Sequence, residues 1–344
     1  MEPLLTIFWD KPTGTVCFID QTLLPGSFRI ERTREVGRLI TAIRRLEVRG
    51  APALGIAGGY GVVLAAMAAS CEPPGMFMES VRKQADTVRN ARPTAVNLSW
   101  GVDRVLRKLE DSSSPEEAVT LALAEAEAIA REDAATCRAL SKHGAGLLPD
   151  SCTVLTHCNA GALACREWGT ALGVIRSAVQ DGKHVKVIAC ETRPLLQGAR
   201  LTAWELARDG IDVTVITDST ASFLMRTGRI DCVIVGADRI TRDAVFNKVG
   251  TYMHAVSARY HGVPFYVAAP RSSFDPIRNE ADVLIEERHR DEIACFGDRV
   301  TLPEGVPVIN LGFDATPLSM VTALITEEGI VRPENILSFL SSEG

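Results

Sequence analysis

The sequence lacks several patterns that would assign a chain of 344 residues to a class at once. Its nine cysteines contain no CxxC pair and are odd in number and irregularly spaced, which argues against zinc knuckles, thioredoxin-like motifs and disulfide scaffolds. No GxGxxG follows the first expected strand and there is no Walker A motif, so we expect no nucleotide cofactor of the usual kind. Lysine and arginine (37) are outnumbered by aspartate and glutamate (43), and no basic stripe stands out, which predicts no nucleic-acid partner. With 46% hydrophobic and 23% charged residues, the composition is that of an ordinary globular protein.

Histidine is also scarce. The six histidines share no ligand spacing, and His157 is followed directly by Cys158, which would point to the opposite face of a strand. We interpret His254 and His261 as surface or helix-end residues. The sequence therefore predicts no metal site.

Charge is absent from residues 51–71, a stretch near the length of a membrane span. The stretch is built of alanine and glycine, contains Pro52 near its start and includes a GxxxG pattern from Gly55 to Gly59. Leucine and isoleucine are sparse, which gives a poor transfer free energy for a lipid-facing helix. We therefore predict a buried helix with close backbone neighbours and no membrane contact. Because no secretory signal is recognisable, we expect a cytoplasmic protein.

The pattern of the chain changes near residue 145. Before it, apolar residues recur at helical spacing over 34–46 and 94–109, and Ser114 with Pro115 predicts the start of one long helix. After residue 150, short β-branched runs alternate with helical patterns, which indicates a parallel sheet covered on both faces. The expected strands are 153–156, 185–189, 213–217, 232–235 and 263–268, and the expected helices between them include 197–208, 219–227 and 248–261. We predict an α/β protein with a mainly helical N-terminal domain with short β-strands (1–145) and a Rossmann-like catalytic domain (146–344).

The candidate catalytic residues follow the expected strands, because ligands of open α/β sheets bind beyond the carboxyl ends of the strands. Cys158 follows the first strand; it is either a small buried residue or a reactive thiol whose pKa is lowered by a helix expected just after it. Asp238 follows the fourth strand; it is either an ion-pair partner of Arg239 or a partly desolvated general acid. Asp218, after the third strand, is explained more simply as a helix cap.

Three cations stand at expected helix starts, where backbone amides attract anions. Arg49 precedes Gly50, Ala51 and Pro52, Arg92 precedes Pro93 and Thr94, and Lys248 follows Asn247. Each is equally explained as a solvated surface charge. Taken together they suggest a phosphate monoester, and hence a phosphosugar enzyme that uses an acid and a thiol.

Longer strings, in order over nearly the whole chain, resemble the methylthioribose-1-phosphate isomerase family. They are Asp20-Gln21-Thr22, VRGAPA (48–53), RPTAVNL (92–98), LTHCNAGAL (155–163), ETRP and QGARLTAWEL (191–206), GADRI (236–240), NKVGTY (247–252) and VPFYVAAP (263–270). The resemblance implies conversion of 5-methylthioribose 1-phosphate to 5-methylthioribulose 1-phosphate in methionine salvage, by a homodimer that needs no cofactor. It implies that Asp238 is the proton donor and that Cys158 is the base or stabilises the transition state. It places the site in a cleft between the two domains, and the substrate contacts that it implies are Arg49, Gly50, Ala51, Arg92, Gln197, Asn247 and Lys248.

Two departures from the family pattern bear on the substituent at C5. The loop between Asp238 and Asn247 is one residue shorter than usual, and residues 309–314 replace a typical Asn-Pro-Ala-Phe-Asp. 5-Deoxyribose 1-phosphate and ribose 1,5-bisphosphate therefore stay open as alternative substrates. A regulatory subunit of the translation initiation exchange factor is the non-enzymatic alternative; those subunits share the fold but lack the paired thiol and aspartate.

Overall fold

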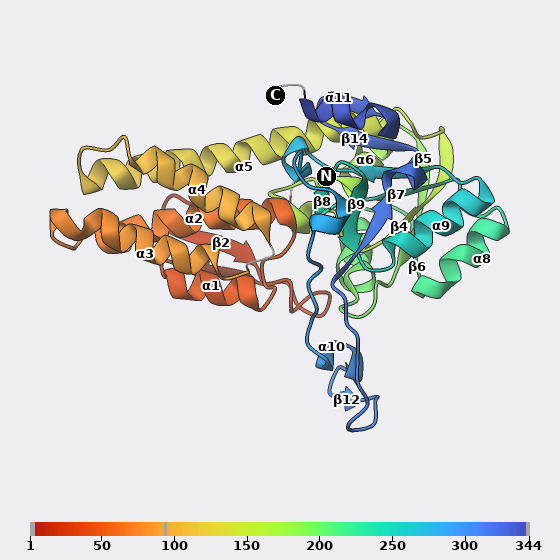
Figure 1. Cartoon of the computed structure of the whole chain (residues 1–344), viewed down its shortest axis with the longest axis horizontal. Coiled ribbons are helices and arrows are strands. Elements are labelled where there is room, and N and C mark those ends of the chain that lie inside the picture. Colours follow the sequence, from red (N-terminus) through yellow and green to blue (C-terminus); the bar gives the residue numbers. More distant parts are fainter. Residues whose placement is uncertain (1–3, 93–94, 342–344) are drawn as a thin grey trace. The chain divides into compact units, whose positions relative to one another are not determined.

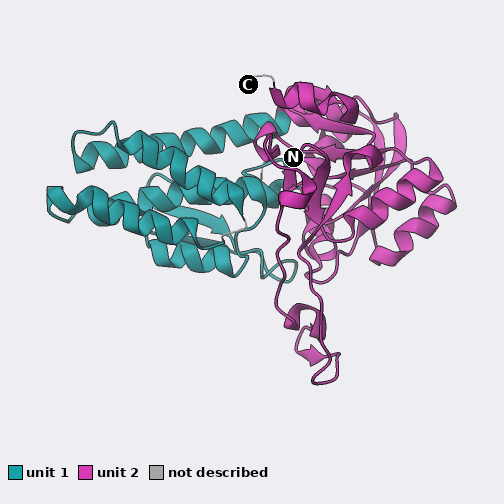
Figure 2. Cartoon of the chain, in the orientation of Figure 1, with its two compact units in different colours: residues 1–138, 161–169 teal, residues 139–160, 170–344 magenta. Residues whose placement is uncertain are grey.

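The computed structural model describes residues 4–92 and 95–341. They form two compact units (Figure 2). Unit 1 is the chain up to Arg138 together with Gly161–Gly169, and unit 2 is Ala139–Ala160 together with the chain from Thr170 onward. The sequence boundary at residue 145 differs from this division in two ways: the units divide inside one long helix, and a nine-residue segment beyond that helix belongs to unit 1.

Unit 1 contains a three-stranded antiparallel sheet and most of the long helices (Figure 1). Its elements are β1 (Ile7–Asp10), β2 (Thr15–Ile19), β3 (Ile30–Thr33), α1 (Val36–Arg44), α2 (Ala51–Ala69), α3 (Phe77–Arg89), α4 (Val96–Leu109) and most of α5 (Pro115–Ala145). The hydroxyl of Ser114 accepts the backbone N–H of Glu117 at 3.2 Å, so the predicted cap of α5 is confirmed.

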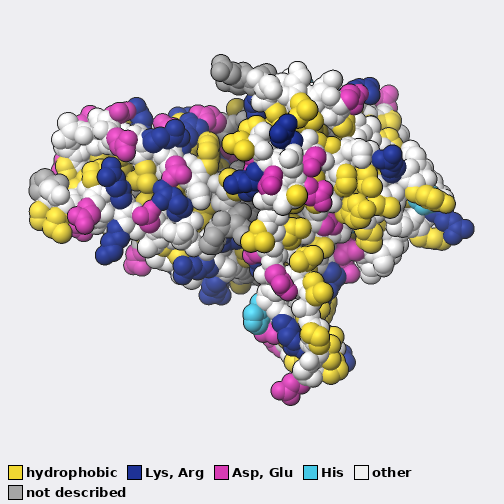
Figure 3. Space-filling model, in the orientation of Figure 1, with side chains coloured by type: hydrophobic (Ala, Val, Ile, Leu, Met, Phe, Trp, Pro, Cys, Tyr) yellow, Lys and Arg dark blue, Asp and Glu magenta, His cyan; other side chains and the backbone are white. Residues whose placement is uncertain are grey.

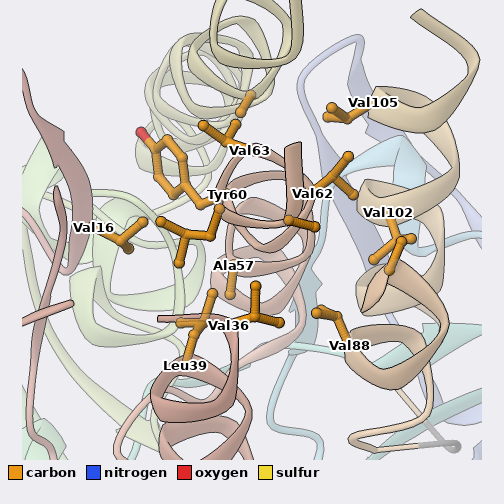
Figure 4. Close-up of a cluster of buried hydrophobic side chains, with 14 of the residues drawn as sticks. Val16, Val36, Leu39, Ala57, Tyr60, Val62, Val63, Val88, Val102 and Val105 are labelled. Carbon is orange, nitrogen blue, oxygen red and sulfur yellow. The ribbon is translucent and has the colours of Figure 1, made fainter. Parts of the chain in front are cut away.

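Helix α2 lies in the core of unit 1, and Figure 4 shows its own Tyr60, Val62 and Val63 among the buried side chains of this core. Among the described residues, α2 is the one helix that is long enough and apolar enough to cross a membrane. However, 78% of its apolar stretch is buried inside the protein. Its backbone touches α4: a Cβ added to Gly101 would collide with the carbonyl of Gly55. The predicted buried helix with close backbone neighbours is therefore confirmed.

Unit 2 is built on a seven-stranded sheet with the order β15-β14-β10-β7-β4-β5-β6. All neighbouring strands pair in parallel except β15, which pairs antiparallel with β14. The strands are β4 (Ser151–Thr156), β5 (His184–Cys190), β6 (Val213–Ile216), β7 (Cys232–Val235), β10 (Phe265–Ala268), β14 (Ala323–Thr326) and β15 (Gly329–Val331). The helices are α6 (Ala171–Gln180), α7 (Ala203–Arg208), α8 (Ala221–Arg226), α9 (Thr251–His261), α10 (Asp291–Ala294) and α11 (Ile336–Ser341).

Successive residues of these strands enter different cores, as period-two alternation requires. Leu155 packs in a cluster with residues of α8, α9 and α11, whereas Val154 packs in a cluster with residues of α6, α7 and the end of α5. The predicted sheet covered on both faces is therefore present. Unit 2 also contains a three-stranded sheet in the order β13-β9-β8. Two of its strands, β8 (Arg239–Ile240) and β9 (Ala244–Lys248), come directly after β7, and the third is β13 (Phe313–Pro317).

The segment 276–312 projects from the rest of unit 2 and carries α10, β11 (Cys295–Phe296) and β12 (Arg299–Val300) (Figure 1). Figure 3 shows hydrophobic side chains along this projection. Its exposed members include Leu284, Ile277 and Ile309, which are 90%, 82% and 79% exposed.

Candidate functional site

Cys158 lies two residues beyond β4, at the carboxyl-terminal ends of the parallel strands. Its side chain is half-buried, and its backbone has φ 63°, in the left-handed region that L-residues rarely adopt. The backbone N–H of Cys158 donates to Oγ1 of Thr192 at 2.8 Å, and its carbonyl accepts the hydroxyl of Thr202 at 2.6 Å. Hydrogen bonds on both sides thus hold the thiol in this uncommon conformation.

The helix that we expected directly after Cys158 is not there. A short 3-10 turn at Ala162–Ala164 follows, and the next α-helix, α6, begins at Ala171. The reason is that the chain leaves unit 2 after Ala160 and returns at Thr170. The expected helix N-terminus is therefore not next to this thiol in the chain, and that part of the prediction was wrong.

Asp238 lies three residues beyond β7, which pairs directly with β4. The two loops touch, because a Cβ added to Gly236 would come within 2.7 Å of the Cβ of Ala160. Asp238 is half-buried, and its backbone N–H donates to the carbonyl of Phe246 at 2.9 Å. Arg239 forms its ion pair with Asp275 at 3.4 Å. Unit 2 thus brings the loops of the candidate acid and the candidate thiol together.

Asn247 and Lys248 do not open a helix, as we had predicted; they end strand β9, and α9 begins three residues later at Thr251. The amide of Asn247 donates to the hydroxyl of Thr251 at 3.0 Å, and the ammonium group of Lys248 donates to the carbonyl of Gly312. Both side chains are buried, at 5% and 7% exposure. A buried lysine at a strand end is a cation held in place rather than a solvated surface charge.

The N-terminus of α9 is already occupied by a carboxylate. Asp314 accepts the backbone N–H groups of Gly250 at 2.7 Å and Tyr252 at 3.2 Å. Burial nevertheless raises the pKa of Asp314 to about 6. The predicted attraction of a phosphate to these amides is therefore wrong for this helix, because Asp314 takes that place.

Gln197 stands directly before the π-helical turn Gly198–Thr202, which leads into α7. Its side chain is 7% exposed, and its Oε1 has no hydrogen-bond partner among residues 4–92 and 95–341. An unpaired buried amide oxygen is costly, so a ligand that donates a hydrogen bond there would be stabilised.

The remaining candidates belong to unit 1. Arg49 and Gly50 directly precede α2, whose first residue is Ala51, as predicted. Gly50 has φ 90° and its α-carbon faces the backbone of Ala164, so a side chain there would meet both backbone strain and a steric clash. Arg92 is described and half-buried, but Pro93 and Thr94, the helix start predicted after it, lie outside the described residues.

His157, directly before Cys158, and His254 form a buried pair, which corrects our interpretation of His254 as a surface or helix-end residue. Nε2 of His157 lies 2.9 Å from the carbonyl of Val249, and Nδ1 lies 3.2 Å from Nε2 of His254. Because a carbonyl only accepts, His157 carries its proton on Nε2 and accepts the N–H of His254 on Nδ1. Burial lowers the pKa of His157 to about 4 and that of His254 to about 3. The pair is neutral at pH 7 and links the loop of Cys158 to the turn after Lys248.

The pair predicts acid sensitivity. Below pH 6.5 the unfolded chain protonates His254 while the folded chain does not, so the free energy of unfolding falls as the pH is lowered toward 4. When the pH is lowered from 6.5 to 4, the free energy of unfolding of a His254→Gln variant should fall by roughly 3 kcal/mol less than that of the wild type. Urea unfolding from pH 7 to pH 4 measures the difference. The matched control is His184→Gln at an exposed position, and equal slopes for wild type and His254→Gln would contradict the assignment.

Two clusters among the described residues could each offer three metal ligands within 4.8 Å: His157, Cys190 and His254, and Asp133, Cys137 and Cys165. In the first, both nitrogens of His157 and Nε2 of His254 are hydrogen-bonded, whereas Nδ1 of His254 has no partner among the described residues. Burial raises the pKa of Cys190. In the second, burial raises the pKa of Asp133 to about 7. In the metal-free chain burial thus favours the protonated thiol and the protonated carboxyl, and the function proposed below uses neither cluster.

Sequence reasoning missed His254 and Asp314. A signal for His254 was present, since it shares a helix face with the buried Ala255 and Ala258. For Asp314 there was none, because its partners on α9 lie more than 60 residues away in the sequence.

The comparisons with known proteins match most of the chain. The family model described as the Initiation factor 2 subunit family matches residues 47–333. A protein of Archaeoglobus fulgidus named putative methylthioribose-1-phosphate isomerase is 53% identical over 95% of this chain and 96% of its own length. A protein of Moorella thermoacetica named 5-deoxyribose 1-phosphate isomerase is 49% identical over 99% of both chains.

Solved structures match over nearly the full length as well. The 5-methylthioribose 1-phosphate isomerase of Pyrococcus horikoshii is 40% identical, with a TM-score of 0.91 over 98% of this chain and 95% of that one. A structure from A. fulgidus described as translation initiation factor eIF-2B, subunit delta, is 51% identical, with a TM-score of 0.89 over 98% of this chain and all of that one. The chain therefore belongs to the Initiation factor 2 subunit family, in which many of its relatives are named methylthioribose-1-phosphate isomerase.

Proposed function

We propose that this chain is an aldose–ketose isomerase that converts 5-methylthioribose 1-phosphate to 5-methylthioribulose 1-phosphate, a step of methionine salvage. The names of the full-length relatives support this activity. The observation that carries the proposal is a thiol and a carboxylate in touching loops beyond β4 and β7. Each stands where a ligand of an open α/β sheet binds.

The first proposed step opens the sugar ring. The phosphate on C1 blocks spontaneous opening, so an acid must protonate the ring oxygen as its bond to C1 breaks. Asp238 is the proposed proton donor. It is half-buried and follows a fully buried strand, so its carboxyl group is held at the strand end where a general acid must be positioned.

The second proposed step moves a hydrogen from C2 to C1, while the hydroxyl group on C2 gives its proton to a group of the chain and so balances the proton donated to the ring oxygen. C2 becomes the ketone carbon and C1 keeps its phosphate. Cys158 is the proposed base or transition-state stabiliser. Its backbone is held by two hydrogen bonds, so the partly exposed sulfur atom has a fixed position beyond the end of β4. A fixed position of a reacting group lowers the activation barrier. Both steps use groups of the chain itself, and the proposal includes no metal or cofactor.

Substrate binding is proposed for the seven residues of the family pattern: Arg49, Gly50, Ala51, Arg92, Gln197, Asn247 and Lys248. The buried Lys248 and the unpaired Oε1 of Gln197 support the assignment in unit 2. The backbone of Gly50 at the start of α2 supports it in unit 1, because a helix N-terminus attracts phosphate. We also propose that the units correspond to a mainly helical domain and a Rossmann-like domain, and that the protein is a cytoplasmic homodimer.

The relative named 5-deoxyribose 1-phosphate isomerase favours that sugar as the second candidate substrate. Residues 309–314, which depart from the family pattern, include Gly312 and Phe313, and Lys248 contacts both. A change in this segment therefore reaches a proposed substrate contact directly.

A substrate panel tests the choice. We expect kcat/KM for the 5-methylthio sugar to exceed that for the 5-deoxy sugar by roughly 10-fold, since a hydrophobic pocket gains 1–3 kcal/mol from one added apolar group. Ribose 1,5-bisphosphate serves as the charged comparison. A higher kcat/KM for the 5-deoxy sugar would replace the proposed substrate and keep the reaction. Absence of turnover with all three would favour the non-enzymatic alternative, which the description of the A. fulgidus structure keeps open.

A further inference from the structure

A buried charged cluster lies beside Cys158, and the proposed reaction does not use it. Arg176 on α6 forms ion pairs with Glu205 of α7 at 2.8 Å and with Asp209 at 2.6 Å. The side chains of all three residues are 7% exposed or less. Replacing such buried ion pairs by apolar residues is often neutral or stabilising, so fold stability alone is a weak reason for this cluster.

One member of the cluster reaches the loop of the thiol. Oε1 of Glu205 accepts the amide N–H of Asn159 at 2.9 Å, while Oε2 accepts from Arg176. The amide of Asn159 also donates to the hydroxyl of Thr202 at 3.2 Å, and that hydroxyl donates to the carbonyl of Cys158. The chain of bonds therefore runs from Arg176 through Glu205 and Asn159 to the backbone of the thiol.

Asp209 differs in one respect. It pairs with Arg176 as Glu205 does, but among the described residues its carboxylate accepts from the guanidinium group alone, and its backbone N–H donates to the carbonyl of Glu205 within α7. The cluster thus contains two carboxylates of equal charge and similar burial on the same arginine. Only Glu205 bonds to the loop of Cys158.

We propose that Glu205, held by Arg176, is a positioning residue that fixes Cys158 in its left-handed conformation through Asn159 and Thr202. This inference rests on the proposed function for the role of the thiol. The left-handed backbone at a non-glycine residue is unfavourable by itself and persists where its surroundings enforce it. The buried ion pair fixes one end of the chain of bonds, and the carboxylate carries that constraint to the loop.

The test compares Glu205→Gln with its matched control Asp209→Asn, since each removes one carboxylate charge from Arg176. A glutamine cannot accept from both Arg176 and Asn159 with one oxygen at the observed geometry, because its amide nitrogen would face one of the two donors. Asn159→Ala is the second variant; it cuts the chain of bonds and leaves both ion pairs in place. Thermal unfolding identifies variants that are folded.

Two readouts are needed. The first is hydrogen exchange of the peptide that contains Cys158, which we expect to quicken about 10-fold in Glu205→Gln and Asn159→Ala and to stay unchanged in Asp209→Asn. The second is the kinetics on the full chain, where kcat should fall about 10- to 100-fold in the first two variants with KM within about twofold. A purely structural role would lower the unfolding temperature of Glu205→Gln and Asp209→Asn alike and leave kcat unchanged.

The outcomes separate this inference from the proposed function. Equal exchange in Glu205→Gln and Asp209→Asn, or faster exchange with unchanged kcat, overturns the positioning role. If the wild type turns over none of the three sugars, the proposed function fails, and the exchange contrast still decides whether Glu205 holds the loop.

Discussion

Replacing Asp238 by asparagine is expected to lower kcat about 100- to 10,000-fold, the range that general acid catalysis contributes. Asparagine has the same shape but cannot protonate the ring oxygen, so the ring stays closed. The backbone N–H of residue 238 still donates to Phe246, and Arg239 keeps its ion pair with Asp275. KM should therefore change little. Steady-state kinetics with the 5-methylthio sugar measure both constants.

Asp231→Asn is the matched control. Asp231 lies directly before β7, at the opposite end of the strand from Asp238, and is exposed. Its carboxylate accepts the N–H of Thr153, which an asparagine oxygen also accepts. A similar kcat for the two variants would contradict the role of Asp238.

Cys158→Ala is also expected to lower kcat by about 100-fold or more, through a different step from that of Asp238. In this variant no group is left to accept or stabilise the hydrogen that moves from C2 to C1. The backbone bonds to Thr192 and Thr202 do not involve the thiol, so the loop should keep its conformation. Unchanged hydrogen exchange of this loop would show that the loss is chemical. Single-turnover kinetics would separate it from product release.

The control for the thiol is Cys71→Ala, since Cys71 is exposed and belongs to unit 1. We expect it to keep the wild-type kcat. If Cys158→Ala retains more than about a third of the wild-type kcat while folded, Cys158 is not part of the chemistry, because acid–base groups contribute at least 100-fold.

Much of unit 2 could be predicted from the sequence because its strands are short, buried and β-branched. The runs at 153–156 and 232–235 were found as strands, and the rule that ligands bind beyond strand ends then singled out Cys158 and Asp238. Direct pairing of β4 with β7 is a property of the sheet order that residue patterns do not reveal.

The errors share one physical cause, which is contact between segments far apart in the sequence. The helical pattern over 248–261 hid a turn at Gly250, where φ is 106°, and the carboxylate that occupies the helix start comes from Asp314. His254 was interpreted as a surface or helix-end residue because its partner, His157, lies 97 residues earlier in the sequence. The helix expected directly after Cys158 does not form, because residues Gly161–Gly169 pack with unit 1.

The measurement that tests the account most directly is a phosphorus NMR time course of the purified full-length protein with 5-methylthioribose 1-phosphate. The account predicts that the signal of the cyclic sugar phosphate is replaced by that of the ketose 1-phosphate, without release of inorganic phosphate, and that Asp238→Asn and Cys158→Ala each slow this change about 100-fold or more. An unchanged spectrum with the folded wild-type protein would contradict it, as would equal rates for wild type and both variants.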